Sequence, residues 1–466
     1  MKQKEKTKKT QYARMTEESI PKLIASLSVP TILSMLVTNI YNLVDTAFVG
    51  RLGTSQSAAV GVIFGYMSII QAVGFMFGQG AGSIMARRLG ARDTDAASRT
   101  ASTGVICSVA LGLLFSLVTF PLKDPIVRFL GSTETIAPHA KSYLDWILIA
   151  APFMTGGYTL NNLLRYEGKA SLGMIGLMTG AILNIALDPL LMFTLNMGIA
   201  GAAIATATSQ IIGFFILLSM FLRGRTEVHL SPRNLDPTPA QIGNIVTTGL
   251  PSMLRQVLNS IATILLNSSA ASFGDEAVAA MSIVGRISFF VFALALGIGQ
   301  GFQPVCAFNF GAGKYSRLRK AYRVTLIMSE TMILITAGLC FQLSNHLIGV
   351  FRDDPAVIAV GTRALRLLAA AYLFLPVCMV TEMLHQSTGH RAGASFLSAL
   401  RSGLLSIPAL LILSRVRGLS GIQEAQPAAM MLSIPFAVLF AVLFFKKLPK
   451  EDATAGGSLP EEARGE

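Results

Sequence analysis

The sequence predicts an all-α polytopic membrane protein whose twelve transmembrane helices form two six-helix lobes. Three observations predict this fold class: the composition, a series of long apolar segments and an internal repeat. Of the 466 residues, 52% are hydrophobic and only 14% are charged, whereas about 25% are charged in soluble domains. The mean hydropathy of +0.58 is incompatible with a surface that faces water along its whole length. Disordered, collagen-like and coiled-coil chains are excluded as well.

Twelve segments are long and apolar enough to cross a bilayer, which takes about 20 residues of helix. In chain order they cover residues 23–49, 57–86, 100–122, 143–164, 171–195, 199–222, 242–272, 277–308, 324–349, 358–384, 393–414 and 427–445. The connections between them are short. None leaves room for a folded soluble domain or for a nucleotide-hydrolysing motor.

The distribution of Lys and Arg predicts the orientation of the chain. With the N-terminus in the cytoplasm, 26 of the 38 Lys and Arg lie on the inner side and seven in outer loops. This is the positive-inside asymmetry, and it explains the net charge of +13 without a nucleic-acid partner. We expect a multi-pass protein of the inner (cytoplasmic) membrane with both termini in the cytoplasm. The apolar segment 23–49 follows a basic leader and has no cleavage site, which predicts a retained helix rather than a signal peptide.

An internal repeat at an offset of 221 residues divides the chain into halves. VPTILSMLVTN at 29–39 matches LPSMLRQVLNS at 250–260, and Gly-Gln-Gly at 78–80 matches the same triplet at 299–301. We therefore expect a basic cytoplasmic leader (1–22), an N-lobe (23–222), a cytoplasmic inter-lobe linker (223–241), a C-lobe (242–445) and a cytoplasmic tail (446–466). Parallel repeats of this kind are typical of transporters.

Two carboxylates inside the predicted spans are the strongest functional candidates, because burying an ionised carboxylate in a bilayer is costly. Asp45 lies six residues before Arg51, and Asp188 lies eight before Asn196, so both are at a similar depth below the outer ends of their helices. Four oxygen-bearing side chains on three helices share this depth, namely Asp45, Asn184, Asp188 and Thr206. They could converge on one cation. The alternative is that each carboxylate caps its helix or forms a local salt bridge.

The chain resembles the multidrug and toxic compound extrusion (MATE) family, and within it the bacterial group of the staphylococcal multidrug exporter and the DNA-damage-inducible F-type proteins. The resemblance runs from Pro30 to the end of the twelfth span. Its most specific stretches are NIYNLVDTAFVGRLG (39–53), NIALDP (184–189), GIAGAAIAT (198–206) and GQGFQPVCAFNFGAGKYSRLRKA (299–321). It implies the MATE fold of twelve helices in two lobes and ion-coupled export of organic cations. It also implies that Asp45, Asn184, Asp188 and Thr206 form the cation site of the N-lobe.

Further residues carry weaker expectations. The resemblance matches Pro30 to a proline at which the first helix bends, although a proline in the first turns of a helix is also ordinary. Candidate residues for the wall of a substrate cavity are Gln79, Arg255, Gln256, Asn259 and Gln300. Arg255, Glu382 and Arg401 also lie within spans, and a structural ion pair between Glu382 and Arg401 is the default interpretation. Their role in a C-lobe cavity stays open.

The predicted function is secondary active antiport: export of amphipathic organic cations, including drugs, in exchange for H⁺ or Na⁺, by alternating access between the lobes. A lipid-linked precursor flippase of the same superfamily is the alternative. An intramembrane enzyme is a weaker one, because no nucleophile and base are paired. We expect no cofactor, no resident metal apart from Na⁺ at the carboxylate site, and a functional monomer. The expected partners are small amphipathic cations and the lipid bilayer.

The repeat predicts that the second half lacks an ion-coupling acid. Leu266 occupies the position that matches Asp45, and the segment that matches NIALDP reads LLSIP. We expect Leu266→Ala to leave the ion preference of transport unchanged, because it removes no titratable group. Export driven in turn by a pH gradient and by a sodium gradient measures this preference. A changed preference would contradict coupling by one lobe.

Overall fold

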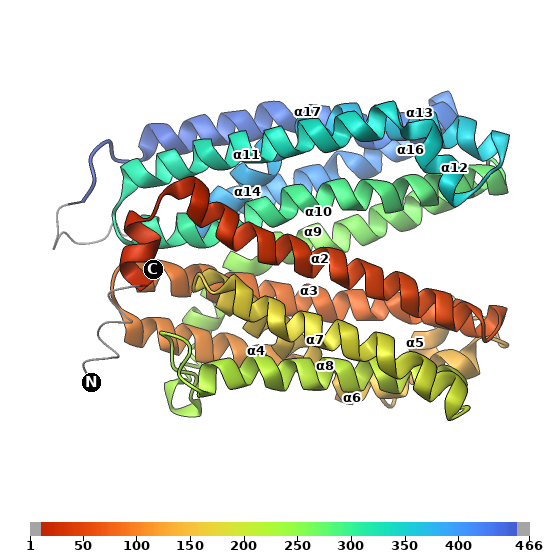
Figure 1. Cartoon of the computed structure of the whole chain (residues 1–466), viewed down its shortest axis with the longest axis horizontal. Helices are drawn as coiled ribbons and strands as arrows, with labels where there is room; N and C mark the ends of the chain where they lie inside the picture. Colours follow the sequence, from red (N-terminus) through yellow and green to blue (C-terminus); the bar gives the residue numbers. More distant parts are fainter. Residues whose placement is uncertain (1–10, 454–466) are drawn as a thin grey trace. The chain divides into compact units, whose positions relative to one another are not determined.

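The computed structural model of the protein describes residues 11–453, and helices make up almost all of them (Figure 1). No strand occurs among the residues described, so the predicted all-α fold is confirmed. Ten helices in this part of the chain are long and apolar enough to span a membrane. The chain is thus a multi-pass membrane protein.

The helices of the first half follow the predicted spans. They are α2 (Ile20–Gly50), α3 (Thr54–Gly90), α4 (Thr94–Thr119), α5 (Lys123–Phe129), α6 (Ala137–Tyr166), α7 (Ala170–Pro189) with the π-helical η1 (Leu190–Thr194), and α8 (Gly198–Leu222). A short 3₁₀ segment, η2 (Pro232–Asn234), lies in the connection to the second half. The short α5 was not expected from the sequence, because seven residues are too few to span a bilayer.

The second half contains a similar series of helices. They are α9 (Pro239–Ala271), α10 (Asp275–Gly311), α11 (Tyr315–Gln342), α12 (Ser344–Phe351), α13 (Pro355–Tyr372), α14 (Leu375–Thr388), α15 (Arg391–Ala399) with the π-helical η3 (Leu400–Leu404), α16 (Ser406–Arg417) and α17 (Leu419–Lys447). Of the long helices, α6 and α9 are not among the ten apolar ones. Both bury polar side chains, such as Thr155 and Thr159 of α6 and Arg255 of α9.

Two predicted spans of the second half differ from the structure. The span 358–384 was predicted as one helix, but it is broken between α13 and α14. Pro376 at the start of α14 has no N–H for the carbonyl of Tyr372, where α13 ends, so the helix cannot continue without a break. The predicted span 324–349 is also divided, because α11 begins earlier, at Tyr315, and ends at Gln342 before α12.

The repeat is visible in the helices themselves. α3 and α10 are 37 residues each, and both of their ends differ by the offset of 221. Gly168 and Gly389, which the repeat pairs, have left-handed backbones with φ of +82° and +88°. Because side chains rarely adopt this conformation, glycine is required at both turns. The two halves therefore use the same local structure at matching positions.

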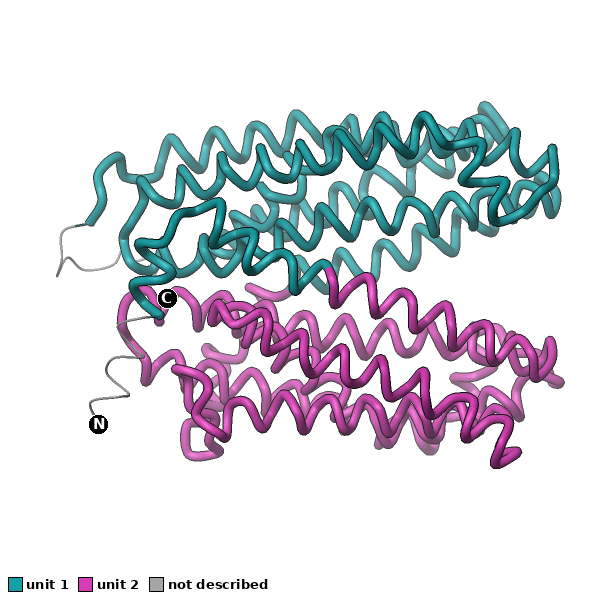
Figure 2. The backbone as a smooth tube through the Cα atoms, in the orientation of Figure 1, with its two compact units in different colours: residues 1–32, 250–466 teal, residues 33–249 magenta. Residues whose placement is uncertain are grey.

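The chain forms two compact units (Figure 2). Unit 1 comprises residues 1–32 and 250–466, and unit 2 comprises residues 33–249. The divisions fall inside α2 and α9, two residues after Pro30 and one residue before Pro251. The predicted lobes kept these two helices whole. The units therefore differ from the predicted lobes in the first turns of α2 and α9.

Glycines allow these first turns to pack closely. Within unit 1, a Cβ on Gly301 of α10 would lie 2.1 Å from Oγ of Ser28 in α2. Within unit 2, a Cβ on Gly249 of α9 would lie 1.8 Å from the carbonyl oxygen of Met76 in α3. Since real side chains do not approach this closely, the helix pairs can touch only where Cβ is absent. Ser28 and Gly249 are also paired by the repeat offset.

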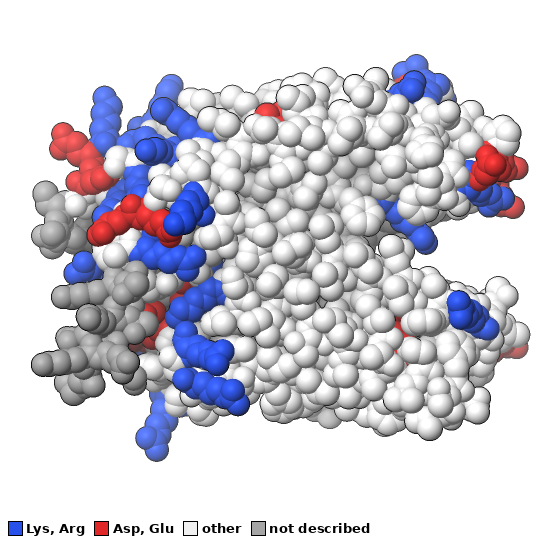
Figure 3. All heavy atoms as spheres, viewed as in Figure 1, with Lys and Arg blue, Asp and Glu red and all other residues white. Residues whose placement is uncertain are grey.

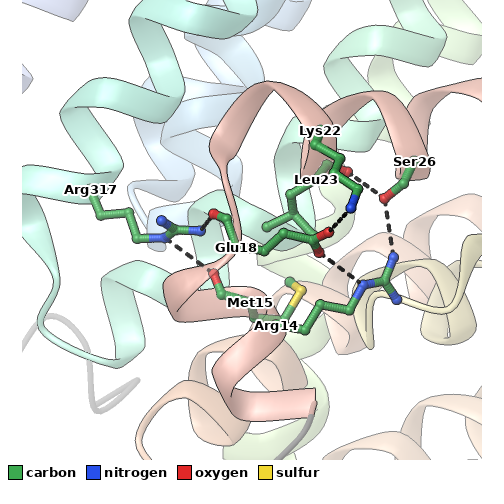
Figure 4. Close-up of polar contacts among 7 residues, drawn as sticks. All are labelled: Arg14, Met15, Glu18, Lys22, Leu23, Ser26 and Arg317. Atoms are coloured by element: carbon green, nitrogen blue, oxygen red, sulfur yellow. Dashed lines mark hydrogen bonds and ion pairs between the residues drawn. The ribbon is translucent and has the colours of Figure 1, made fainter.

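The leader is docked on the start of α11 in unit 1, as Figure 4 shows. Arg317 donates hydrogen bonds to the carbonyl oxygens of Met15, at 3.3 Å, and of Glu18. Arg14 and Lys22 both form ion pairs with the Glu18 carboxylate. Residues 1–10 of the predicted leader and 454–466 of the predicted tail lie outside the described residues. The part of the leader that is described is thus anchored by buried and charged contacts.

The predicted inter-lobe linker is held against unit 2 rather than extended from it. Ser98, Ser102 and Thr103 of α4 accept hydrogen bonds from its backbone N–H groups at residues 229, 231 and 236, over 3.0 to 3.2 Å. The buried carboxylate of Glu167, just after α6, accepts from the backbone N–H of Glu227. Burial raises the pKa of Glu167 to about 7, and the neighbouring Lys169, at 2.7 Å, opposes this shift.

Charged side chains are concentrated at helix ends. On the face drawn in Figure 3, Lys and Arg gather at one end of each unit, and the middle of each unit is almost free of charge. Such an apolar middle fits the hydrocarbon part of a bilayer, where exposed charges are costly.

The close contact of α9 with α3 can be tested with glycines of α9. We expect Gly249→Ala to destabilise the protein by about 1–3 kcal/mol, since its methyl group would overlap a backbone carbonyl that cannot rotate away. Gly243→Ala is the matched control, because a Cβ at Gly243 meets nothing within 4 Å. It should be neutral or stabilising by up to about 1 kcal/mol. Thermal unfolding of the purified variants in detergent measures both. Equal midpoints for the two variants would contradict the close contact.

Candidate functional site

The predicted carboxylate site lies in unit 2, where three helices contribute to it. Asp45 comes from the last turns of α2, Asn184 and Asp188 from the end of α7, and Thr206 from α8. Pro189 follows Asp188 directly and has no N–H to donate to the carbonyl of Ile185. The helix then widens into the π-helical η1. π-helical turns often occur at functional sites.

The structure brings the four predicted residues together. The amide Nδ2 of Asn184 donates to Oδ1 of Asp188 at 3.4 Å and to Oγ1 of Thr206 at 3.3 Å. The carboxyl groups of Asp45 and Asp188 are close enough to interact electrostatically. Asp188 is fully enclosed, and Asn184 and Thr206 are 2% and 5% exposed. The cluster therefore combines three buried groups, on Asn184, Asp188 and Thr206, with the half-buried Asp45.

Two tyrosines that sequence reasoning missed complete the surroundings. Tyr143 of α6, 1% exposed, lies near Thr206, and Tyr41 lies one turn before Asp45 in α2. Tyr41 could have been found from the sequence, because residues four apart share a helix face. Tyr143 could not, since nothing in its local sequence links α6 to this cluster.

Three acceptor oxygens of this cluster are unsatisfied. Oδ1 of Asp45, Oδ1 of Asn184 and Oδ2 of Asp188 are buried and have no hydrogen-bond partner among the described residues. Buried polar atoms are nearly always hydrogen-bonded, so each exception calls for an explanation. The two carboxylate oxygens can take up a proton, and all three oxygens can ligate a hard cation, which prefers oxygen ligands. No sulfur or imidazole ligand belongs to the cluster.

A narrow cavity of about 40 Å³ adjoins the cluster within unit 2. Its lining includes Tyr41, Asn184 and Thr206 of the site, together with Thr38 and Ser209. Pockets for organic ligands are about 300–1,000 Å³, whereas one water takes about 30 Å³ in the liquid. The cavity therefore has room for water or a small ion but not for an organic molecule.

The other predicted residues are distributed over the two units. Gln79, in unit 2, is fully buried and accepts a hydrogen bond from Tyr166 at 3.2 Å. Gln300, 3% exposed, lies in α10 of unit 1, where Gln256 and Asn259 of α9 are half-buried. Pro30 is inside α2, which continues as helix on both sides of it. A substrate cavity lined by these glutamines and Asn259 stays a prediction.

Arg255 belongs to a second buried charge cluster, in unit 1. Its Nη1 donates to Oε1 of Glu382 in α14 at 2.5 Å. Arg401, in the π-helical η3, forms an ion pair with Oε2 of the same carboxylate at 3.6 Å. The expected ion pair between Glu382 and Arg401 is thus present, but Arg255 lies closer to the Glu382 carboxylate than Arg401 does.

Comparison with known proteins connects this geometry to a family. The model of the MatE family matches residues 30–190 and 251–412, one segment in each half of the repeat. The multidrug export protein MepA of Staphylococcus aureus is 28% identical over 402 residues, which cover 86% of this chain and 89% of MepA. MepA of Staphylococcus haemolyticus is 27% identical over 407 residues, which cover 87% of this chain and 90% of that protein.

Solved structures agree with these sequence matches. A crystal structure of MATE in complex with MaL6 is similar to this chain, with a TM-score of 0.88 and 27% sequence identity. The alignment covers 94% of this chain and 99% of that chain. An outward-facing multidrug resistance MATE family transporter of the MOP superfamily has the same TM-score, identity and coverage.

Proposed function

The chain belongs to the MatE family, and from this premise we propose that it is a secondary active antiporter that exports amphipathic organic cations in exchange for H⁺ or Na⁺. It is a multidrug export transporter of this family rather than an enzyme, as its relatives are named. The coupling ion and the cationic nature of the substrates are the part that we propose.

The observation that carries the proposal is the set of three unsatisfied buried oxygens on Asp45, Asn184 and Asp188. A fixed structural network would satisfy these atoms, because an unpaired buried acceptor costs about 1–3 kcal/mol. A proton shared by the two carboxyl groups, or Na⁺ held by the same oxygens, would satisfy these atoms in one state of the transporter. Release of the ion would leave them unpaired in the other state. The site thus has the chemistry that reversible coupling requires.

The electrical driving force sets the scale of the work. One positive charge that enters across 100 mV supplies about 2.3 kcal/mol. Two carboxylates in a medium of low dielectric repel each other and lose hydration, which favours a single bound cation over two free charges. Binding at Asp45 and Asp188 would then stabilise one conformation of an alternating-access cycle, because a ligand shifts an equilibrium by its differential affinity for the two states. Pro30, which interrupts the hydrogen bonds of α2, is our candidate for a bending point.

The remaining expectations form part of the same proposal. The protein would work as a monomer without a cofactor, in the inner (cytoplasmic) membrane, with both termini in the cytoplasm. The positive-inside distribution of Lys and Arg supports this orientation. Small amphipathic cations would reach the transporter from the cytoplasm or from the bilayer.

The role of Asp45 can be tested by removing its charge. We expect Asp45→Asn to reduce gradient-driven export of a fluorescent cation to the level of empty liposomes, because asparagine cannot exchange the coupling ion. The matched control is Asp145→Asn, in α6 of the same unit. Asp145 pairs with Lys123 at 2.6 Å on a partly exposed surface, and such pairs contribute little.

The control should transport as the wild type does, and both variants should unfold near the wild-type temperature. Wild-type export by a well-folded Asp45→Asn variant would remove the proposed coupling site.

We favour the proton over Na⁺ as the coupling ion. Drug export from proteoliposomes should then follow an imposed pH gradient and proceed in sodium-free buffer, because two adjacent carboxyl groups can share a proton. Export that stops without sodium and returns when sodium is added at constant pH would decide for Na⁺ instead. Neutral oxygens from Asn184 and Thr206 would then serve as additional ligands.

A further inference from the structure

Unit 1 contains a buried charge cluster with an excess of positive charge. Arg255, Glu382 and Arg401 come from α9, α14 and η3, and they are 6%, 1% and 8% exposed. Two guanidinium groups and one carboxylate leave a net charge of +1 inside a membrane-spanning bundle. A buried charge without a counter-charge is strongly unfavourable.

The carboxylate of Glu382 is committed mainly to Arg255. Its Oε1 accepts from Nη1 of Arg255 at 2.5 Å. Its Oε2 lies 3.6 Å from Nη2 of Arg401, which is too long for a hydrogen bond. The Arg255–Glu382 pair is therefore close to neutral on its own, and the excess charge belongs to Arg401.

Two nitrogens of the Arg401 guanidinium group are left without an acceptor. Nε and Nη2 are buried and have no hydrogen-bond partner in the described part of the chain. These two nitrogens lie on one edge of the planar guanidinium group, the edge that can hold both oxygens of a carboxylate. Oγ of the next residue, Ser402, is also buried without a partner. Arg401 thus offers a fork of two neighbouring nitrogen donors, Nε and Nη2, that could bind both oxygens of one carboxylate.

The surroundings of Arg401 combine a special backbone with aromatic side chains. Arg401 and Ser402 lie in the π-helical η3, and π-helical turns are frequent at functional sites. The guanidinium carbon lies 5.8 Å from the ring centroid of Phe292. Tyr372, 4% exposed, also lies near this charge. An anionic group attached to an aromatic or apolar body would find both kinds of contact here.

A purely structural ion pair does not account for this arrangement. A structural ion pair would be neutral, and its N–H donors would be hydrogen-bonded. Buried ion pairs also add little to stability, because their replacement by apolar residues is often neutral or stabilising. The cluster instead has one positive charge in excess and two unpaired nitrogens on one edge of Arg401, which is an arrangement that can bind an anion.

We propose that Arg401, with the Arg255–Glu382 pair beside it, forms an anion-binding site for the carboxylate of an amphiphilic substrate. This inference rests on the proposed function, because it adds a chemical class to the substrates of the same exporter. Arg401 donates from Nε and Nη2 to the two carboxylate oxygens. Arg255 keeps Glu382 from occupying that fork.

Two dyes that differ in one ester test the site by direct binding. Rhodamine 110 carries a benzoate that is ionised at neutral pH, and rhodamine 123 is its methyl ester. Their dissociation constants are measured by fluorescence polarisation with the purified full-length protein in a buffer of low ionic strength, which limits competition by buffer anions. We expect Arg401→Gln to weaken binding of rhodamine 110 at least about tenfold and to change binding of rhodamine 123 less than about threefold.

Two further variants separate the proposal from a structural effect. Arg401→Lys keeps the charge but loses the fork, so the affinity for rhodamine 110 should be intermediate. Arg363→Gln is the matched control, because Arg363 in α13 is half exposed and pairs with Glu424 near a helix end. It should leave both dissociation constants unchanged.

The ratio of the two dissociation constants decides the outcome. A merely structural role of Arg401 would weaken both dyes together, and an unchanged ratio in Arg401→Gln would overturn the proposal. Failure of wild-type protein to bind rhodamine 110 would overturn it as well. Because equilibrium binding needs no ion gradient, retained binding of rhodamine 123 with an unchanged ratio would refute only this inference. Failure of ion-coupled export would instead refute the proposed function.

Discussion

A hydrocarbon interior offers no hydrogen-bond partner to a peptide group, and this constraint underlies the architecture of the chain. Helices satisfy their own backbone groups, which is why the described residues form long helices with short connections. The same constraint makes exceptions informative. The break before Pro376 and the two π-helical segments leave the regular pattern, and both π-helical segments lie at or beside ionisable residues, Asp188 and Arg401.

Charges inside the spans are the second consequence of the same constraint. Unit 2 holds two acids beside Asn184 and Thr206, with three unsatisfied acceptor oxygens. Unit 1 holds two guanidinium groups around one carboxylate, with unsatisfied donors on Arg401. Neither cluster is explained by stability, because a fully paired or apolar arrangement would cost less. Unpaired acceptors in unit 2 and unpaired donors in unit 1 are the features on which the proposed cation and carboxylate sites rest.

Close packing at glycines holds the first turns of α2 within unit 1 and those of α9 within unit 2. Gly249 and Gly301 allow the first turns of α9 and α2 to lie directly on α3 and α10. Both helices then continue into the other unit, near Pro251 and Pro30. A proline there lacks the hydrogen bond that would stiffen the helix. Both segments are therefore natural places for a bend. Only α2 also carries an acid of the proposed ion site beyond its proline, so only a bend in α2 could be coupled directly to ion binding.

The sequence alone determined the membrane class, the all-α fold, the repeat and the family, because apolar periodicity, glycine spacing and charge asymmetry act locally or along the chain. It also placed Asp45, Asn184, Asp188 and Thr206 at one depth, because helical rise converts residue number into depth. Only the tertiary structure decided which residues meet across helices. Tyr143 joins the acid cluster, and Arg255 rather than Arg401 is the closer partner of Glu382. Such contacts depend on how each helix is rotated and packed, and neither rotation nor packing is encoded in residue spacing within a single helix.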